Sequence, residues 1–283
     1  MKVVEKAAAK INLGLDTTYR HSDGMPEWNM VMTSVDLADY VEVQATGTPQ
    51  IVVSSNSGFL PNDQRNLAFQ AASLLQRTFH VKQGAVINIQ KNIPVAAGLG
   101  GGSSDAAAVM RALNELWGLQ LPLAELAKLS LNVDSDVPYC IFSKTAHVTG
   151  LGENVHVLNP PLTPVWVVLA KPNVSVSTPS ILRQIDYDSL AHPAIGAILS
   201  AIEQGDYQQL VANMGNALEP ISVNRYPEIE QIKARMQVYG AQTAIMSGTG
   251  PTVFAIFNKQ SRAQRVFNSI RGFCSEAYLV RSL

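Results

Sequence analysis

Cysteine is scarce in this sequence, and the way it occurs excludes several classes of small protein. Only Cys140 and Cys274 occur among 283 residues, and neither belongs to a Cys-x-x-Cys pair. A disulfide scaffold and a zinc ribbon both need closely spaced cysteines, so neither is expected. The five histidines are scattered and lack metal-binding spacing. We therefore expect two buried thiols without a disulfide, and no transition-metal site.

An excess of positive charge and long apolar runs are also lacking. Lysine and arginine total 21 against 22 aspartate and glutamate residues, a net charge of −1. This is too little positive charge to hold a nucleic acid by neutralising its phosphates. No apolar run approaches the ~18–20 residues that cross a bilayer, and the first residues lack the apolar segment of a signal peptide. These absences predict a cytoplasmic protein without a nucleic-acid or membrane partner.

The sequence does have enough apolar residues to build folded cores throughout. Hydrophobic residues make up 47% of the chain and charged residues 15%, which argues against extended disorder. Single cores stop growing near roughly 250–300 residues, so a chain of this length suits two domains. The clearest break is the proline-rich segment Asn159–Pro164. We place the boundary there, which divides the chain into domains 1–160 and 161–283.

Apolar residues at strand or helix spacing predict the elements of both domains. In the first domain we expect strands at 40–45, 51–53 and 85–90, and helices at 66–79 and 105–117, the second of them stopped by Gly118. In the second domain we expect a strand at 165–170, several helices over 179–239, paired strands at 243–246 and 252–257, a helix at 260–270 and a strand at 276–281. This order predicts the α+β class.

The segment between the strand at 85–90 and the following helix carries the clearest chemical signal. Residues 94–105 read Pro-Val-Ala-Ala-Gly-Leu-Gly-Gly-Gly-Ser-Ser-Asp, with four glycines within five positions. Glycine lets a backbone approach phosphate oxygens and adopt positive φ, and the N–H groups and dipole of the next helix favour an anion. Ser103 and Ser104 are candidates to cap that helix or to donate to phosphate, and Ser104 is also a candidate Mg²⁺ ligand.

Two better-known phosphate loops do not fit this segment. The Walker pattern needs a Gly-Lys-Ser/Thr sequence, and no lysine occurs between Lys91 and the helix. The Gly-x-Gly-x-x-Gly pattern fails because Ser103 stands at the third glycine position. A flexible turn before a helix is the plain structural alternative. Four glycines followed at once by two hydroxyl groups favour phosphate binding over such a turn.

At this loop the chain resembles the GHMP kinases, whose second motif is Pro-x-x-x-Gly-Leu-Gly followed by small residues and serines. Residues 9–13, Ala-Lys-Ile-Asn-Leu, are similar to the first motif of that family. Residues 247–252, Ser-Gly-Thr-Gly-Pro-Thr, are similar to the third. The resemblance covers nearly the whole chain, and three motifs in the right order are more specific than one glycine loop.

The resemblance implies a two-lobed α+β fold, with an N-terminal nucleotide-binding lobe and a ferredoxin-like C-terminal lobe. It also implies that ATP with Mg²⁺ donates a phosphoryl group to an alcohol. Carried over by position, Asp136 is the catalytic base, and Lys10 is the cation that favours its ionised form. The implied phosphate-binding residues are Pro94, Gly98, Leu99, Gly100, Gly101, Gly102, Ser103 and Ser104, and the implied substrate-binding residues are Asn12, Gly248 and Thr249.

Each of these charged residues also has a plain structural explanation. Taken alone, Lys10 is as well explained as a surface lysine, and Asp136 as a carboxylate that caps a helix or fixes a turn. Residues 247–252 are likewise compatible with a simple turn between strands.

Asp134 stands where the family usually has a small residue, and like-charge repulsion from it would oppose ionisation of the proposed base.

The loop has three consecutive glycines, and the chain also has Asp-Gly at 23–24, Ser-Asp-Val-Pro at 135–138, Gly-x-Gly-Glu at 150–153 and Ser-Thr-Pro at 177–179. With these features the chain is most similar, within the family, to a branch that acts on a cytidine diphosphate compound of an isoprenoid-precursor pathway. That branch usually has Tyr-His and a later aromatic residue against the cytosine ring, where this chain has Met25, Pro26 and Leu182. Stacking and base-edge contacts are what a cytidine pocket needs. Three interpretations therefore stay open: a kinase of that compound, a GHMP-type kinase of another small alcohol, and a non-catalytic nucleotide-binding regulator. The protein is expected to be a monomer or a homodimer.

Overall fold

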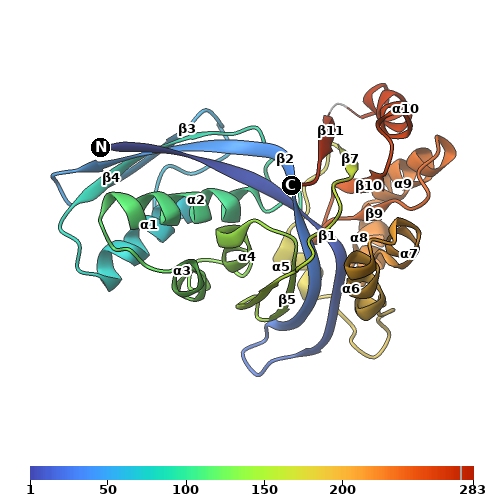
Figure 1. Ribbon diagram of the computed structural model, residues 1–283, viewed down its shortest axis with the longest axis horizontal. Coiled ribbons are helices and arrows are strands. Elements are labelled where there is room, and N and C mark those ends of the chain that lie inside the picture. The colour runs from blue at the N-terminus through green and yellow to red at the C-terminus, as the bar shows by residue number, and fades with distance from the viewer. Residues whose placement is uncertain (275) are drawn as a thin grey trace. The chain divides into compact units, whose positions relative to one another are not determined.

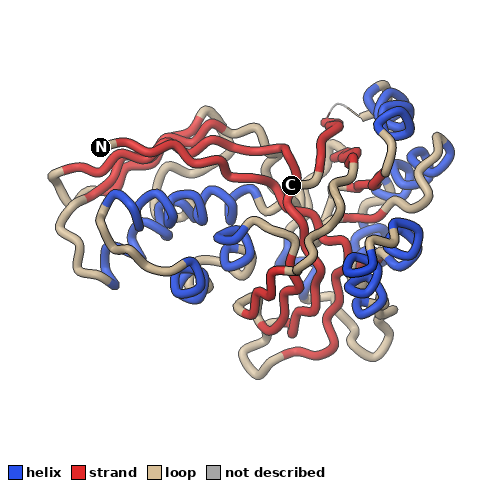
Figure 2. Tube along the Cα trace, in the orientation of Figure 1, coloured by secondary structure: helices blue, strands red, loops and turns tan. Residues whose placement is uncertain are grey.

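The computed structural model describes residues 1–274 and 276–283, and the chain forms two compact units. The first unit comprises residues 1–9, 37–95 and 100–143, and the second comprises residues 10–36, 96–99 and 144–283. Strands β1 (Lys2–Arg20) and β2 (Pro26–Thr46) contribute residues to both units and are among the long red stretches of Figure 2. The division of the sequence into domains 1–160 and 161–283 stays a prediction.

The first unit is a sheet with helices on one face (Figure 1). The last part of β2 pairs antiparallel with β4 (Gly84–Gln90), and β4 pairs parallel with β3 (Ile51–Ser55). The predictions of strands at 40–45, 51–53 and 85–90 are confirmed, as is the helix predicted at 66–79. The helices of this unit are α1 (Leu67–Thr78), α2 (Gly101–Leu116), α3 (Leu123–Ser130) and α4 (Val137–Phe142).

Helix α2 begins four residues earlier than its apolar stripe predicts. The residue that caps it is Gly100, whose φ of 65° is left-handed and which makes no side-chain cap bond. The prediction that Ser103 or Ser104 caps this helix is therefore wrong, because both already lie in its first turn. Glycines supply no apolar stripe, so the periodicity of the sequence begins only after them. At the other end, Gly118 has a φ of 66°, which confirms the predicted left-handed stop.

The second unit contains a four-stranded antiparallel sheet with the strand order β11-β7-β10-β9. Helices α9 and α10 pack on it through a core that includes Val168, Ile232, Phe257 and Val266. A strand–helix–strand–strand–helix–strand sequence in this order is the ferredoxin-like arrangement, as the resemblance implied. The elements are β7 (Trp166–Lys171), α9 (Glu228–Val238), β9 (Ile245–Met246), β10 (Val253–Phe257), α10 (Gln260–Arg271) and β11 (Glu276–Arg281).

Within the second unit, further strands pair with the first residues of β2 and the later residues of β1. The hairpin of β5 and β6 pairs with β2, and β8 pairs parallel with β1 through Gly14 and Gly215. Helices lie where the predicted range 179–239 placed them. These elements are β5 (Ala146–Gly150), β6 (Asn154–Val157), β8 (Gly215–Asn216), α5 (Thr178–Leu182), α6 (Ile195–Gln204), α7 (Tyr207–Asn213) and α8 (Glu219–Arg225).

Both cysteines lie in the interior of the fold. Cys140 and Cys274 are buried and lie outside any disulfide, as predicted. Among the described residues, no helix combines the length and apolarity needed to span a membrane.

Candidate active site

The predicted phosphate loop depends on glycine for its backbone path. Gly98 has a φ of 75°, and an added Cβ there would lie 2.3 Å from the carbonyl oxygen of Ser247. No side chain fits at that distance, and L-residues rarely adopt that φ. Glycine is therefore required at this position for its conformation and for the close approach of a second backbone segment.

Parts of the three sequence motifs meet within the second unit. Ser247 Oγ donates to the carbonyl oxygen of Gly98 at 2.9 Å, and the backbone N–H of Thr252 donates to that of Ala97 at 3.3 Å. The backbone N–H of Lys10 donates to the carbonyl oxygen of Leu99 at 2.9 Å. Residues 10–13, 96–99 and 247–252 are thus joined by hydrogen bonds to the backbone of residues 97–99, although they are far apart in the sequence.

Lys10 is buried in this cluster, with 4% of its surface exposed, so the explanation as a surface lysine is wrong. Its Nζ donates to Asn12 Oδ1 at 2.9 Å. It also lies 3.4 Å from the position that a Cβ on Gly248 would take. The Asn12 amide in turn contacts Met30 Sδ at 3.4 Å. The predicted residues Lys10, Asn12 and Gly248 are therefore brought together, with the ammonium group beside the glycine turn.

The glycine turn at residues 247–250 is held by the last residue of β8 and the first residue of α8. Asn216 Nδ2 donates to the carbonyl oxygens of Met246 and Gly248, at 2.8 and 2.7 Å. Glu219 Oε2 accepts from the backbone N–H of Met246 at 2.6 Å. One buried amide and one carboxylate thereby fix the backbone that enters and crosses the turn. Sequence reasoning missed both residues.

Thr249, the other residue of the turn predicted to bind substrate, is anchored on two sides. Its carbonyl oxygen accepts from Ser222 Oγ at 3.0 Å, and its hydroxyl lies 2.8 Å from the hydroxyl of Thr178. Thr178 belongs to the Ser-Thr-Pro segment at 177–179. These contacts place that segment directly against the glycine turn.

Asp136 lies in the first unit, immediately before α4. It occupies the N-cap position, but its side chain makes no cap bond, so the explanation as a helix-capping carboxylate is wrong. Its backbone N–H donates to Asp134 Oδ1 at 3.1 Å, and the same oxygen accepts from Ser103 Oγ at 2.8 Å. Lys10 belongs to the second unit. The pairing of Lys10 with Asp136 stays a prediction.

The two serines after the glycines both use their hydroxyl hydrogens inside the protein. Ser103 donates to Asp134, and Ser104, which is 2% exposed, donates to the carbonyl oxygen of Ala8. The hydroxyl oxygen of Ser104 keeps lone pairs, which are what a Mg²⁺ ion would use. Its role as a metal ligand stays a prediction.

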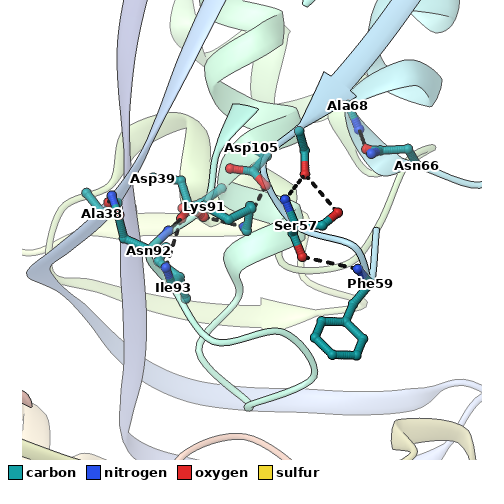
Figure 3. Close-up of polar contacts among 12 residues, drawn as sticks. Ala38, Asp39, Ser57, Phe59, Asn66, Ala68, Lys91, Asn92, Ile93 and Asp105 are labelled. Carbon is teal, nitrogen blue, oxygen red and sulfur yellow. Dashed lines mark hydrogen bonds and ion pairs between the residues drawn. The ribbon is translucent and has the colours of Figure 1, made fainter. Parts of the chain in front are cut away.

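A buried ion cluster lies beside the first turns of α2 (Figure 3). The Lys91 ammonium pairs with Asp39 and, at 2.7 Å, with Asp105 Oδ2, and all three side chains are at most 6% exposed. Asp39 Oδ1 also accepts from the backbone N–H groups of Asn92 and Ile93, at 2.6 and 2.8 Å. These bonds fix the chain where it leaves β4 and approaches the phosphate loop.

The cluster lies next to the glycines that begin α2. Lys91 Nζ lies 3.2 Å from the position that a Cβ on Gly101 would take. Burial raises the pKa of Asp105 to about 8, with the charge of Lys91 opposing the shift and that of Asp39 adding to it. Among the described residues, Asp105 Oδ1 has no hydrogen-bond partner. A protonated Asp105 leaves the cluster with no net charge, which is the form that burial favours.

Comparison with known proteins shows which family this chain is part of. Residues 66–144 match the family model "GHMP kinases N terminal domain", and residues 198–276 match "GHMP kinases C terminal". A 4-diphosphocytidyl-2-C-methyl-D-erythritol kinase from Levilactobacillus brevis is 65% identical over 100% of both chains. One from Lactiplantibacillus plantarum is 63% identical over 99% of this chain and 98% of the relative. The chain belongs to the GHMP kinase family.

Solved structures agree with this assignment. This GHMP kinase is similar to a crystal structure of 4-(cytidine 5'-diphospho)-2C-methyl-D-erythritol kinase, with a TM-score of 0.82 and 30% identity over 99% of both chains. A homoserine kinase from Cytophaga hutchinsonii shares the fold, with a TM-score of 0.81 at 19% identity over 100% of this chain and 94% of that one. The predicted family and the predicted α+β fold are confirmed.

Proposed function

We propose that this GHMP kinase transfers the γ-phosphoryl group of ATP to the hydroxyl group of 4-diphosphocytidyl-2-C-methyl-D-erythritol. The observation that carries the proposal is the full-length similarity to kinases with that name, several of which are 54–65% identical to this chain. The two relatives at 65% and 63% identity match this chain over 100% and 99% of its length. The geometry of the site supports phosphoryl transfer independently of the names.

Phosphoryl transfer needs little covalent chemistry from the protein, so positioning and charge stabilisation dominate. In this proposal the triphosphate lies on Gly98–Ser104, where left-handed glycines expose backbone N–H groups and the N-terminus of α2 favours negative charge. Pro94 precedes that loop, and Leu99 lies within it with its side chain buried. Mg²⁺ enters with ATP as part of the substrate and offsets the charge of the phosphates.

Lys10 and Asp136 have separate tasks at the acceptor hydroxyl. Asp136 accepts the hydroxyl proton as the oxygen attacks the γ-phosphorus and the bond from that phosphorus to the bridging oxygen breaks, so that ADP leaves, and Lys10 stabilises the negative charge that develops. Asn12 holds the Lys10 ammonium through the bond of 2.9 Å, so that this charge is oriented before substrate arrives. Gly248 and Thr249 bring backbone groups to the acceptor from the fixed glycine turn.

The residues at the expected cytosine contacts favour a second candidate function, a kinase of another small alcohol. Met25 is 41% exposed, and its backbone N–H is held by Asp23 Oδ1 at 2.9 Å. The carbonyl oxygen of Leu182 is 3.5 Å from Arg20 Nη2, and the Arg20 guanidinium lies over the ring of Tyr187 at 5.7 Å. None of the side chains at positions 25, 26 and 182 is aromatic.

A substrate panel separates the two candidates. The purified protein is incubated with Mg·ATP and either 4-diphosphocytidyl-2-C-methyl-D-erythritol, homoserine or mevalonate, and ADP release and product mass are measured. Turnover of the cytidine compound alone supports the proposal, and turnover of another alcohol alone supports the second candidate. ATP binding without ADP release on any acceptor would contradict both. Lys10→Met and the exposed-site control Lys128→Met show whether turnover depends on this site.

A further inference from the structure

We propose that Asp134 is a positioning residue that holds the phosphate loop and the proposed base in a fixed relation. The proposal rests on the proposed function in assigning Ser103 and Asp136 to the site. A single carboxylate oxygen, Asp134 Oδ1, accepts from Ser103 Oγ at 2.8 Å and from the backbone N–H of Asp136 at 3.1 Å. All three residues belong to the first compact unit.

The two donors to Asp134 come from the two segments that must be aligned for phosphoryl transfer. Ser103 lies in the first turn of α2, directly after the glycines, and is 6% exposed. Asp136 precedes α4, and its backbone N–H is the group that Asp134 holds. A fixed N–H group fixes the plane of the peptide unit that ends at the Asp136 Cα, and the Asp136 side chain is attached to that atom. Asp134 therefore links the first turn of α2, which is proposed to bind the phosphates of ATP, to Asp136, which is proposed to accept the proton of the alcohol. We call this link the Asp134 tie.

The hydrogen bonds to Asp134 explain why a carboxylate is useful at this position. The sequence predicts repulsion between Asp134 and Asp136, but in the structure Asp134 Oδ1 meets an O–H and an N–H donor. Hydrogen bonds to a charged acceptor are roughly twice as strong as neutral ones, and these two offset part of the charge that Asp136 would meet. Glycine, the small residue usual at this position in the family, has no side-chain oxygen with which to make either bond.

Loss of this tie should act on the chemical step more than on binding. Displacements of about 1 Å away from the reacting atoms can lower turnover by roughly a hundredfold. For Asp134→Ala we expect kcat to fall roughly ten- to hundredfold, with KM for the alcohol changed by less than about threefold. Asp134→Asn keeps an oxygen at Oδ1, and we expect it to recover kcat to within about fivefold of the wild type.

The experiment is a double-mutant cycle with an activity-independent measurement beside it. Values of kcat and KM are determined for the wild type, Asp134→Ala, Asp134→Asn, Ser103→Ala and the double alanine variant, on whichever alcohol the wild type phosphorylates. Asp188→Ala is the control at an exposed aspartate. Coupling predicts that Asp134→Ala costs less in the Ser103→Ala background than in the wild type. If Asp134→Ala does not fold, Asp134→Gly takes its place, because it resembles the small residue usual in the family.

The second measurement is hydrogen exchange at the Asp136 amide, which needs no substrate. The tie predicts faster exchange in Asp134→Ala than in the wild type, and recovery in Asp134→Asn. A kcat within twofold of the wild type, equal costs in both backgrounds, failure of Asp134→Asn to recover kcat, or unchanged amide exchange would each overturn the proposal. A wild type without turnover on any alcohol would overturn the proposed function instead, and the exchange measurement would still decide whether Asp134 holds Asp136.

Discussion

The buried carboxyl of Asp105 predicts a dependence of stability on pH that Asp105→Asn should remove. Asp105 is 1% exposed, and burial raises its pKa from 3.8 to about 8. The unfolded chain has an ionised Asp105 above about pH 4, while the folded protein keeps it protonated until about pH 8. Folding therefore takes up a proton in this window. Because the folded pKa is the higher one, the stabilisation is complete below the unfolded pKa and is lost as pH rises through the folded pKa.

The magnitude follows from the size of the window. One proton changes the free energy of unfolding by about 1.4 kcal/mol per pH unit while only one of the two states holds it. Between pH 6 and pH 8 the wild type should lose about 2 kcal/mol through this group, and above about pH 9 nothing more. Asparagine has nearly the shape of a protonated aspartate and carries no proton that titrates here, so it can still meet Lys91 but gives no such slope.

The assay is urea unfolding at pH 6, 7 and 8, followed by circular dichroism, for the wild type, Asp105→Asn and the exposed-site control Asp188→Asn. Groups common to all three proteins cancel when free energies are subtracted at each pH. The wild type minus Asp105→Asn should fall by about 2 kcal/mol from pH 6 to pH 8, and the wild type minus the control should stay flat. A constant difference for Asp105→Asn would show that this carboxyl is ionised in the folded protein, and the reasoning about burial would be refuted.

Three further predictions concern the site itself. Gly98→Ala should abolish ADP release and lower the free energy of unfolding by more than about 1 kcal/mol, because its Cβ would meet the carbonyl oxygen of Ser247; wild-type turnover and stability would contradict this. Asn216→Ala and Asn216→Asp both lose the two donors to the glycine turn and should lower stability by about 1–3 kcal/mol with reduced kcat, whereas normal unfolding curves would argue that the turn holds itself. Lys10→Met and Asp136→Asn should each lower kcat by orders of magnitude with ATP affinity by calorimetry almost unchanged, and near-normal kcat in either would remove that residue from the mechanism.

Much of the fold could be predicted because its signals are local. Strand β4, the glycine loop and helix α2 follow one another along the chain, and each has its own pattern of alternation, glycine or helical spacing. No strand was predicted for β1, although Ile11, Leu13 and Leu15 alternate with polar residues or glycine over 10–16. Its residues from Ala7 to Thr17 are all buried, so the polar members of this alternation are enclosed by other elements instead of facing solvent, which the pattern alone does not show. The start of α2 was also misplaced, since glycines carry no apolar pattern.

For the candidate site, the sequence determined which charged and polar side chains the protein has, and the packing of the fold determined which of them contact one another. The three motifs can be recognised in the sequence, because each is a short continuous segment with glycine at the positions that need positive φ or close approach. Lys91 meets Asp39 and Asp105, 52 and 14 residues away, and Asn216 meets the turn some 30 residues further on. The sequence separation of these residues does not predict their contacts, because the contacts form only when separate strands and helices pack and bury their polar groups together.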